Sequence, residues 1–303
     1  MPGRMKRWWT VLVVAAALGV TAGCGSLPYG IDGNLTDDWP APARPESFRP
    51  AADGCFDALE PTAPLASYAP FDCAERHVAE AYFVGDLTGD AASPDADDAP
   101  RDGASPAHIA AAAECGRRAT TFLGAEWRHG RLRLQPVLPA SKGWAAGARW
   151  FRCDIAQVDV STDRVVSRTG SLRDALRGAA PLALTCFNPT VRDDRVRAMR
   201  AVRCADRHYA EFAGLWTAPD IDFADLVGND AMAAGCRSVI AGYAGVPDDG
   251  DLRFRVGWLG FAPTRAEWEL GVRSVQCFLW LESKTMKGSY RGAGTGKLPI
   301  NYA

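Results

Sequence analysis

Apolar residues recur along the chain in short runs, many of them alternating, separated by turns rich in Gly, Pro and Asp. This pattern is typical of short strands with a buried face. In the first half, strands are predicted at residues 55–56, 71–84, 132–138 and 150–155. In the second half, strands are predicted at residues 186–187, 212–215 and 256–258 and around residue 277.

An Ala-rich segment predicts one helix in each half. Ser105 suits the N-cap of the first helix and Pro106 its first position, because proline lacks a donor that would be unpaired there. This helix is expected over residues 107–122, with Gly124 as its stop. Residues 231–243 predict the second helix.

The cysteines follow the same order in both halves. The first set is Cys55, Cys73, Cys115 and Cys153, and the second is Cys186, Cys204, Cys236 and Cys277. Residues 73–80 nearly coincide with residues 204–211, and such repeats must be recognised before domains are counted. We therefore expect an α+β fold of two tandem homologous domains, residues 53–178 and 184–303. Each would be a small antiparallel sheet in β-β-α-β-β order with one packed helix.

Three segments carry no such pattern. Residues 159–180 are expected to form a turn and short helix that bridges the copies, and the Gly- and Lys-rich residues 284–303 are expected to fray. Residues 86–106 contain six aspartates and predict a solvated loop. These aspartates lack the spacing of an EF-hand calcium loop.

The N-terminus has the order of an export signal. Basic residues precede an apolar run from Trp8 to Val20, which is shorter than the ~20 residues of a membrane span. The small residues that follow, up to Cys24, resemble a bacterial lipobox, whose cysteine is acylated. We expect a lipoprotein signal peptide at residues 1–23 and a disordered Pro/Gly-rich tether at residues 24–52. The alternative is an ordinary cleaved signal.

Composition and charge narrow the class of protein. The 303 residues are 48% hydrophobic and 23% charged, with a formal net charge of −2. Bulk charge of this size implies neither nucleic acid nor an anionic membrane surface as a partner. Eight of the nine cysteines divide between the two sets, which leaves Cys24 for a lipid. Both uses of cysteine predict an extracytoplasmic protein, anchored to the outer face of the cytoplasmic membrane.

Four cysteines allow three pairings in each half, and spacing alone does not choose between them. We expect the first to pair with the fourth and the second with the third, which would join the terminal strands and staple the helix to the sheet. The expected disulfides are Cys55–Cys153, Cys73–Cys115, Cys186–Cys277 and Cys204–Cys236.

His77 with Glu80, and His208 with Glu211, are the main candidates for binding or chemistry. This spacing places both side chains on one face of a helix but on opposite faces of a strand. The residues that follow favour a strand. We therefore expect each histidine to bond the local backbone, and each glutamate to cap a turn or pair with a neighbouring arginine. A metal needs three or four convergent ligands, so none is expected.

Trp144 with Arg149, and Trp268 with Arg273, are further binding candidates, because such pairs can line a sugar or peptide groove. Packing across the sheet, with each arginine paired to a local carboxylate, is the reading we favour. The chain has no Gly-x-Ser-x-Gly elbow, no P-loop and no Gly-x-Gly-x-x-Gly segment after a strand. No catalytic residue and no cofactor are therefore expected.

The order of these short motifs carries a resemblance. Cys-Phe, then Cys-x-x-x-His-x-x-Glu, a helical Cys, and Pro-x4-Trp-x2-Gly-x-Arg-x3-Cys occur in both halves. This order resembles the septum-formation domain of actinobacterial envelope proteins. The resemblance implies an exported, membrane-tethered and cysteine-paired protein linked to septation or envelope upkeep, and it implies no known reaction.

We therefore expect a noncatalytic envelope lipoprotein with a binding or scaffold role. Its expected partners are the membrane, through the lipid anchor, and proteins of the envelope or the division site, but not nucleic acid. The groove between the two halves is the natural place for a partner. One alternative is an envelope hydrolase that uses His77 or His208 as its base, and another is a ligand-binding sensor.

Overall fold

A computed structural model describes residues 48–61, 69–93, 105–178, 180–193, 195–228 and 230–301. These residues belong to one compact unit that begins at Ser47. The predicted signal peptide and Cys24, and nearly all of the predicted tether, lie outside the described residues, as does most of the aspartate-rich loop.

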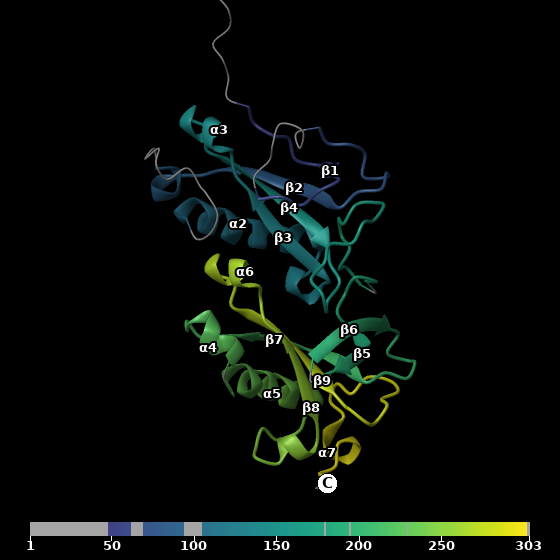
Figure 1. Ribbon diagram of the computed structural model, residues 1–303. Helices are drawn as coiled ribbons and strands as arrows, with labels where there is room; N and C mark the ends of the chain where they lie inside the picture. The colour runs from purple at the N-terminus through teal and green to yellow at the C-terminus, as the bar shows by residue number, and fades with distance from the viewer. Residues whose placement is uncertain are drawn as a thin grey trace, which may run out of the picture. The chain divides into compact units, whose positions relative to one another are not determined.

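The first half of this unit is a four-stranded antiparallel sheet with the strand order β1-β2-β4-β3. Helix α2 packs on it, as Figure 1 shows. Its elements are β1 (Gly54–Phe56), β2 (Ala79–Asp86), η2 (Gly89–Ala92), α2 (Pro106–Leu123), η4 (Trp127–His129), β3 (Leu132–Val137), α3 (Ser141–Ala145) and β4 (Trp150–Gln157).

The second half is a five-stranded antiparallel sheet with the order β6-β5-β7-β9-β8, on which α5 packs. Its elements are β5 (Cys186–Arg192), β6 (Arg195–Val202), β7 (Ala210–Thr217), α4 (Phe223–Gly228), α5 (Asp230–Ala244), η5 (Leu252–Phe254), β8 (Gly257–Phe261), α6 (Arg265–Glu269), β9 (Ser274–Trp280) and α7 (Gly294–Lys297).

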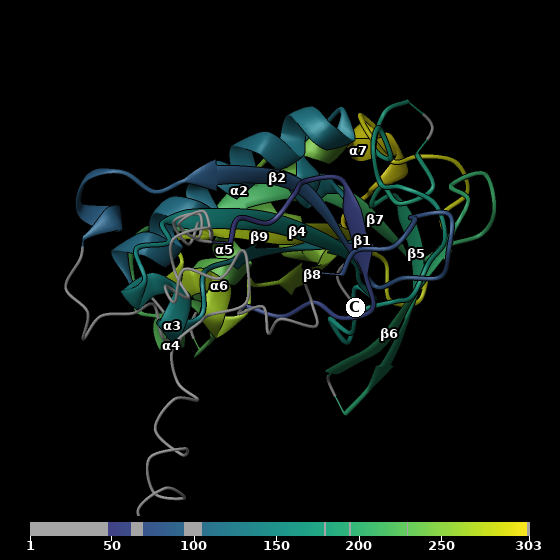
Figure 2. The ribbon, with the colours of Figure 1, turned by 90° about the horizontal axis from the view of Figure 1, so that it is seen from above.

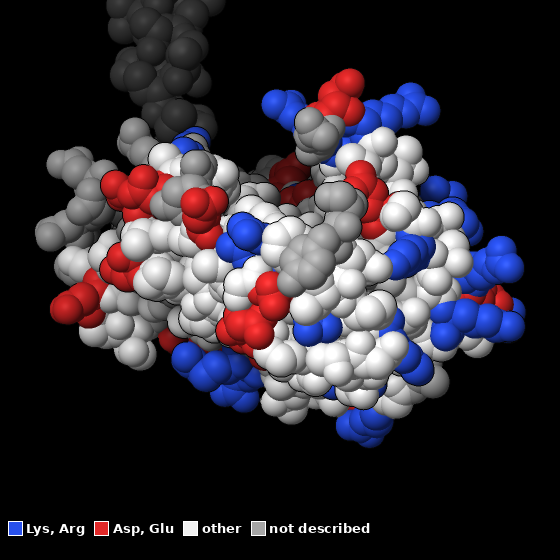
Figure 3. Space-filling view, turned by 90° about the horizontal axis from the view of Figure 1, so that it is seen from below, with Lys and Arg blue, Asp and Glu red and all other residues white. Residues whose placement is uncertain are grey.

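The predicted α+β class with two antiparallel sheets is confirmed, and strand β6 is the main addition. Each half contains the expected succession of two strands, a helix and two strands. Strand β6 extends the second sheet at its edge, and its hairpin with β5 projects from the sheet in Figure 2. Basic side chains predominate on the right-hand margin of the molecule in Figure 3, the side on which β5 and β6 lie in Figure 1.

The caps predicted for the first helix are confirmed. The Ser105 hydroxyl accepts a hydrogen bond from the backbone N–H of His108, and Pro106 begins the helix. At the other end Gly124 adopts φ 81°, a left-handed conformation that glycine takes without strain. Its N–H donates to the carbonyl of Thr120, which closes the last turn.

All eight predicted cysteines form disulfides, but the predicted pairing is wrong. The bonds are Cys55–Cys73, Cys115–Cys153, Cys186–Cys204 and Cys236–Cys277. The prediction required β1 to reach β4, yet β2 lies between them. Two strand spacings are about 10 Å, which exceeds the Cα separation that a disulfide allows. The helix is therefore stapled to the central strand, and β1 to the turn before β2.

Two segments that were expected to be peripheral are structural. Residues 159–178 form turns rather than a short helix, and Arg168 makes a paired backbone bridge with His77. In the C-terminal segment Met286 makes the same bridge with His208. Leu298 is buried in the core beneath α5. The described part of that segment therefore packs instead of fraying.

The face of the first sheet opposite α2 contains a buried ion pair. Arg152 and Asp154 alternate with the helix-facing residues of β4, and their side chains are 3% and 1% exposed. Arg152 donates two hydrogen bonds to the Asp154 carboxylate, of 2.7 and 2.6 Å, and lies over the ring of Phe56. Burial raises the pKa of Asp154, and the Arg152 guanidinium opposes that shift.

Replacing Arg152 by methionine should destabilise the protein by about 3–5 kcal/mol, because it leaves the Asp154 carboxylate buried without its partner. The double variant Arg152→Met/Asp154→Leu should recover most of this loss. Denaturant unfolding with the disulfides intact measures both. Arg133→Met, which breaks the more exposed pair with Asp163, is the control and should cost at most about 1 kcal/mol. Equal midpoints for the two single variants would contradict the assignment.

Candidate functional site

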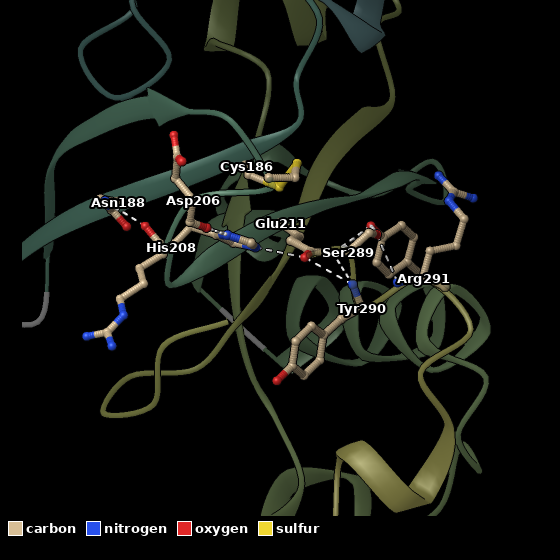
Figure 4. A network of polar contacts seen from close by, with 11 residues as sticks. Cys186, Asn188, Asp206, His208, Glu211, Ser289, Tyr290 and Arg291 are labelled. Carbon is tan, nitrogen blue, oxygen red and sulfur yellow. Dashed lines mark hydrogen bonds and ion pairs between the residues drawn. A yellow bond between two sulfur atoms is a disulfide. The ribbon is translucent and has the colours of Figure 1, made fainter. Parts of the chain in front are cut away.

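His208 lies before strand β7, at the end of a turn that starts at Cys204. Its backbone N–H and carbonyl pair with Met286, which fixes the ring's position. The ring Nδ1 is 2.9 Å from the carbonyl oxygen of Asp206, and Nε2 is 2.8 Å from Oε1 of Glu211. Figure 4 shows the imidazole held between these two acceptors.

Glu211 lies on β7 and collects donors from two other segments. The Tyr243 hydroxyl of α5 donates over 2.7 Å, the backbone N–H of Tyr290 over 2.9 Å, and the Ser289 hydroxyl over 3.3 Å (Figure 4). Glu211 is fully buried. These donors satisfy the lone pairs of the carboxyl oxygens, which a buried carboxyl group requires.

The hydrogen bonds occupy both nitrogens of the histidine ring. Nδ1 contacts the Asp206 carbonyl and Nε2 contacts the Glu211 carboxyl group. His208 and Glu211 therefore form a buried hydrogen-bonded pair. The pair crosses from the turn to the strand, while Tyr243 extends it to the helix.

The Tyr243 hydroxyl donates a hydrogen bond to Glu211. Burial is the largest cause that raises its pKa to about 12, and the Glu211 carboxylate adds to the rise, while the Ser289 hydroxyl opposes it. The Arg291 guanidinium lies 4.7 Å from the centre of the Tyr243 ring. The phenol therefore stays protonated at neutral pH and serves as a hydrogen-bond donor.

The first half repeats the carboxylate arrangement around Glu80. Ser171 donates its hydroxyl and Leu172 its backbone N–H to the Glu80 carboxylate, each over 2.6 Å. His77 Nδ1 is 2.9 Å from the carbonyl of Glu75, and its Nε2 has no hydrogen-bond partner among the described residues. His77 and Glu80 therefore lie close together, as His208 and Glu211 do, but with a different hydrogen-bond pattern.

Arg168 accounts for part of this difference. It occupies the bridge position that Met286 holds in the second half. Burial lowers the pKa of Arg168, and the negative charge of Glu80 opposes that shift. Glu80 in the first half thus has a nearby arginine, whereas Glu211 in the second half has a hydrogen-bonded histidine.

The expectation that histidine and glutamate lie on opposite faces is wrong. It assumed one continuous strand, but β2 begins at Ala79 and β7 at Ala210, so each histidine precedes its strand. Alternation of side chains therefore does not apply between them. Each histidine does bond the local backbone as expected. The glutamates accept donors from a turn about 80–90 positions away in the sequence, rather than from a neighbouring arginine.

Sequence reasoning missed that distant turn. It reads Gly170-Ser171-Leu172-Arg173 in the first half and Gly288-Ser289-Tyr290-Arg291 in the second. In each copy the glycine N–H donates to the cysteine that precedes the histidine, Cys73 or Cys204. The repeated Gly-Ser-x-Arg motif could have predicted this turn. Its two copies lie in residues 159–180, predicted to be a bridging turn and short helix, and in residues 284–303, predicted to fray.

The cluster in each half does not supply a third metal ligand. A cysteine sulfur, a histidine nitrogen and a glutamate oxygen lie within 4.8 Å of one another in the sets Cys55, His77, Glu80 and Cys186, His208, Glu211. Both sulfurs belong to disulfides, and a thiolate is the form of cysteine that binds metal. The oxidised protein therefore offers two ligands in each set.

The tryptophan–arginine candidates lie in the cores. Trp144 and Trp268 are buried, and the guanidinium groups of Arg149 and Arg273 lie 3.9 and 4.0 Å from the respective ring centres. Each arginine also donates to the carbonyl of its own tryptophan. Arg273 further pairs with the local carboxylate of Asp220, whereas Arg149 donates to backbone carbonyls.

A cavity of about 520 Å³ opens beside the Glu211 network. Tyr243, Ser289 and the Cys186–Cys204 disulfide line it from the second half, and His129 and Leu176 from the first. The rings of His129 and Phe212 meet edge to face at 5.6 Å across the same junction. The outer members of the buried network therefore form part of a surface that both halves share.

The bulge residue of β7 lines this cavity. Both β2 and β7 bulge at the same point, at Tyr82 in the first half and Ala213 in the second. The Tyr82 ring stacks on Phe122 with centroids 5.3 Å apart. The side chain of Ala213 is a single methyl group, much smaller than the Tyr82 ring, and it lines the cavity.

Comparison with known proteins adds one finding. The sequence model described as septum formation matches residues 52–277, which is more than half of the chain, covers the first sheet and ends within β9 of the second. The chain belongs to the septum formation family. The match is a single one across both halves, so the interpretation as two tandem copies stays a prediction. No curated protein and no solved structure gives a significant match.

Membership of the septum formation family indicates a role linked to septum formation. The four disulfides, together with this family, fit an extracytoplasmic protein. Within the described parts of the chain, the helices are too short or too polar to cross a bilayer.

In this septum-formation protein, Glu211→Gln should cost about 2–4 kcal/mol of stability, because an amide turns one of its acceptor sites into a donor facing donors. Denaturant unfolding at neutral pH under oxidising conditions measures the loss. Glu269→Gln, at an exposed position of α6, makes the same change outside the network and should be nearly neutral. If both variants unfold at the same denaturant concentration, the network does not hold the second half together.

Proposed function

We propose that this protein is a noncatalytic lipoprotein, anchored through Cys24 on the outer face of the cytoplasmic membrane, with a binding or scaffold role in septum formation or envelope maintenance. The family match over residues 52–277 is the observation that carries the proposal. The sequence from Trp8 to Cys24, with its apolar run and lipobox-like end, supports the anchor.

The use of the acid–base residues supports a noncatalytic role. His208 and Glu211 hold each other, and both are fully buried. The Glu80 carboxylate is saturated by a turn from a distant segment. Groups arranged in this way stabilise the fold instead of meeting a substrate, because a general base must reach the proton that it removes.

The cavity beside Tyr243 supports binding, and we place the partner there. Its volume of about 520 Å³ lies in the usual range for small-ligand sites. Arg291 and Ser289 supply polar groups at its wall, and Phe212 and Leu176 supply apolar surface. The same features fit a sensor lipoprotein, for which a ligand would raise the melting temperature.

We also propose that the two halves are copies of one module. The matched disulfides, the bulges of β2 and β7, and the two Gly-Ser-x-Arg turns support this reading. Strand β6 would then be an addition to the second copy.

The anchor predicts that Cys24→Ser releases the protein from the membrane fraction and abolishes incorporation of labelled fatty acid. The eight remaining cysteines are in disulfides and should take up no label. Cell fractionation and gel fluorography measure both effects. A variant that still co-sediments with membranes and carries label would rule out Cys24 as the acylated residue.

The septal role predicts that the tagged protein gathers at division sites and that its depletion disturbs septa. Thr185→Trp, at an exposed position that lines the cavity, should weaken both localisation and complementation. Thr217→Trp adds the same side chain to an exposed position of β7 that does not line it and should behave as wild type. Uniform localisation together with normal septa after depletion would refute the proposal.

The rival hydrolase is distinguished by the variant His77→Ala/His208→Ala. If both histidines are structural, the variant should lose thermal stability, and any loss of complementation should follow that loss of folded protein. Loss of function with an unchanged melting temperature would instead support the hydrolase.

A further inference from the structure

Positive charge is concentrated on the β5–β6 hairpin and the turn that follows it. Residues 186–207 contain six arginines and three aspartates, in a chain whose net charge is −2. All six arginines are exposed. Figure 3 shows the basic margin on this side of the molecule. The net charge of the whole chain is therefore close to zero although this hairpin and turn are strongly basic.

The pairing of β5 with β6 sorts the side chains of this hairpin into two faces. Phe187 lies opposite Ala201 and Pro189 opposite Met199, and Phe187 and Met199 are buried in the core. Since paired residues share a face and neighbours alternate, Arg192, Arg195 and Arg200 lie on the other face. Arg197 is the extra residue of a bulge in β6. Beyond it Val196 pairs with Val191 on the Phe187 face, so Arg195 and Arg192 pair on the other face.

A fourth arginine joins this face from the turn. Asn188 lies directly opposite Arg200, and its side-chain amide donates to the carbonyl of Arg207 over 3.4 Å. The backbone of Arg207 is thereby held beside the arginine face. We call Arg192, Arg195, Arg200 and Arg207 the arginine face.

The aspartates nearby neutralise other arginines. Asp193 pairs with Arg197, and Asp206 pairs with Arg203 through two hydrogen bonds. Among the described residues, the arginine face has no carboxylate within ion-pair distance. Among these residues, no carboxylate competes with an external anion for its four guanidinium groups.

The arrangement is unfavourable for the isolated hairpin. Arg192 and Arg195 are direct cross-strand partners, and like charges in that position destabilise a sheet. Charge on an edge strand also discourages strand addition, and β6 is an edge. Edge protection does not require the charges to gather on the face opposite Phe187 and Met199. A flat anionic partner accounts for both features.

We propose that the arginine face docks on an anionic phospholipid surface. Guanidinium groups bind phosphate oxygens through paired hydrogen bonds, and an extended hairpin presents several of them in one plane. This proposal rests on the membrane anchor of the proposed function. The segment from Gly25 to Ser47 spans at most roughly 80 Å, so an anchor at Cys24 allows the hairpin to reach the bilayer.

The test uses the full chain mixed with vesicles and phenylglyoxal, which modifies exposed arginines and is read residue by residue by mass spectrometry. The four face arginines should react about fivefold more slowly on vesicles of one part phosphatidylglycerol to two parts phosphatidylcholine than on phosphatidylcholine alone. Arg117 and Arg253, exposed on α2 and η5, are internal controls whose rates should not change. Salt of about 0.5 M should remove the protection.

Flotation of the same samples separates this proposal from the anchor. Protein that floats with anionic vesicles while the face arginines react at the control rate would overturn the docking proposal and leave the anchor intact. Protein that does not float with anionic vesicles would overturn docking as well. Protection by soluble polyphosphate, without protection by anionic vesicles, would assign the face to a soluble polymer instead.

Arg195→Gln checks that binding and folding are separate. It removes the repulsion with Arg192, so the unfolding midpoint should stay unchanged or rise. Protection of Arg192 and Arg200 by anionic vesicles should fall at the same time. Arg253→Gln makes the same charge change on η5 and should leave their protection at the wild-type level. Undiminished protection in Arg195→Gln would contradict a shared docking face.

Discussion

Two buried carboxylates organise this fold. A carboxyl group away from water is tolerated only when it is hydrogen-bonded, and Glu80 and Glu211 obtain donors from a turn that lies far along the chain. Each glutamate therefore ties its own strand to the Gly-Ser-x-Arg turn, and Glu211 also holds the histidine turn before it. The neighbouring disulfide closes the same corner of each half. Removing the carboxylate would leave several donors unpaired at once.

This constraint shapes what the protein can do. The histidines and glutamates that are the main candidates for chemistry make internal contacts, and the tryptophan–arginine pairs pack in the cores. The groups left for the outside are of a different kind. They are the wall of the cavity near Tyr243 and the exposed arginines of the β5–β6 hairpin. A protein built in this way is suited to recognition at a surface.

The two halves keep the same frame and differ at the positions that create these surfaces. Where the first half has Tyr82 at its bulge, the second has Ala213 and a cavity. The first half places the buried pair Arg152–Asp154 on the face of its sheet opposite α2. In the second half, the corresponding strand is β9, and its residue Phe278 packs against Phe187. The frame is set by disulfides and carboxylates, and the differences lie in what fills the space around it.

The sequence by itself determined the α+β class, the two helices, the caps of the first helix, the set of eight bonded cysteines and the family. These follow from local rules: a capping serine, a left-handed glycine, and paired cysteines in an exported chain. The tertiary structure decided which cysteines join, because strand order places β2 between β1 and β4. It also decided that histidine and glutamate meet, and that the chain's linker and tail complete their site. Such contacts join residues about 80–90 positions apart, and no local pattern records which strands become neighbours.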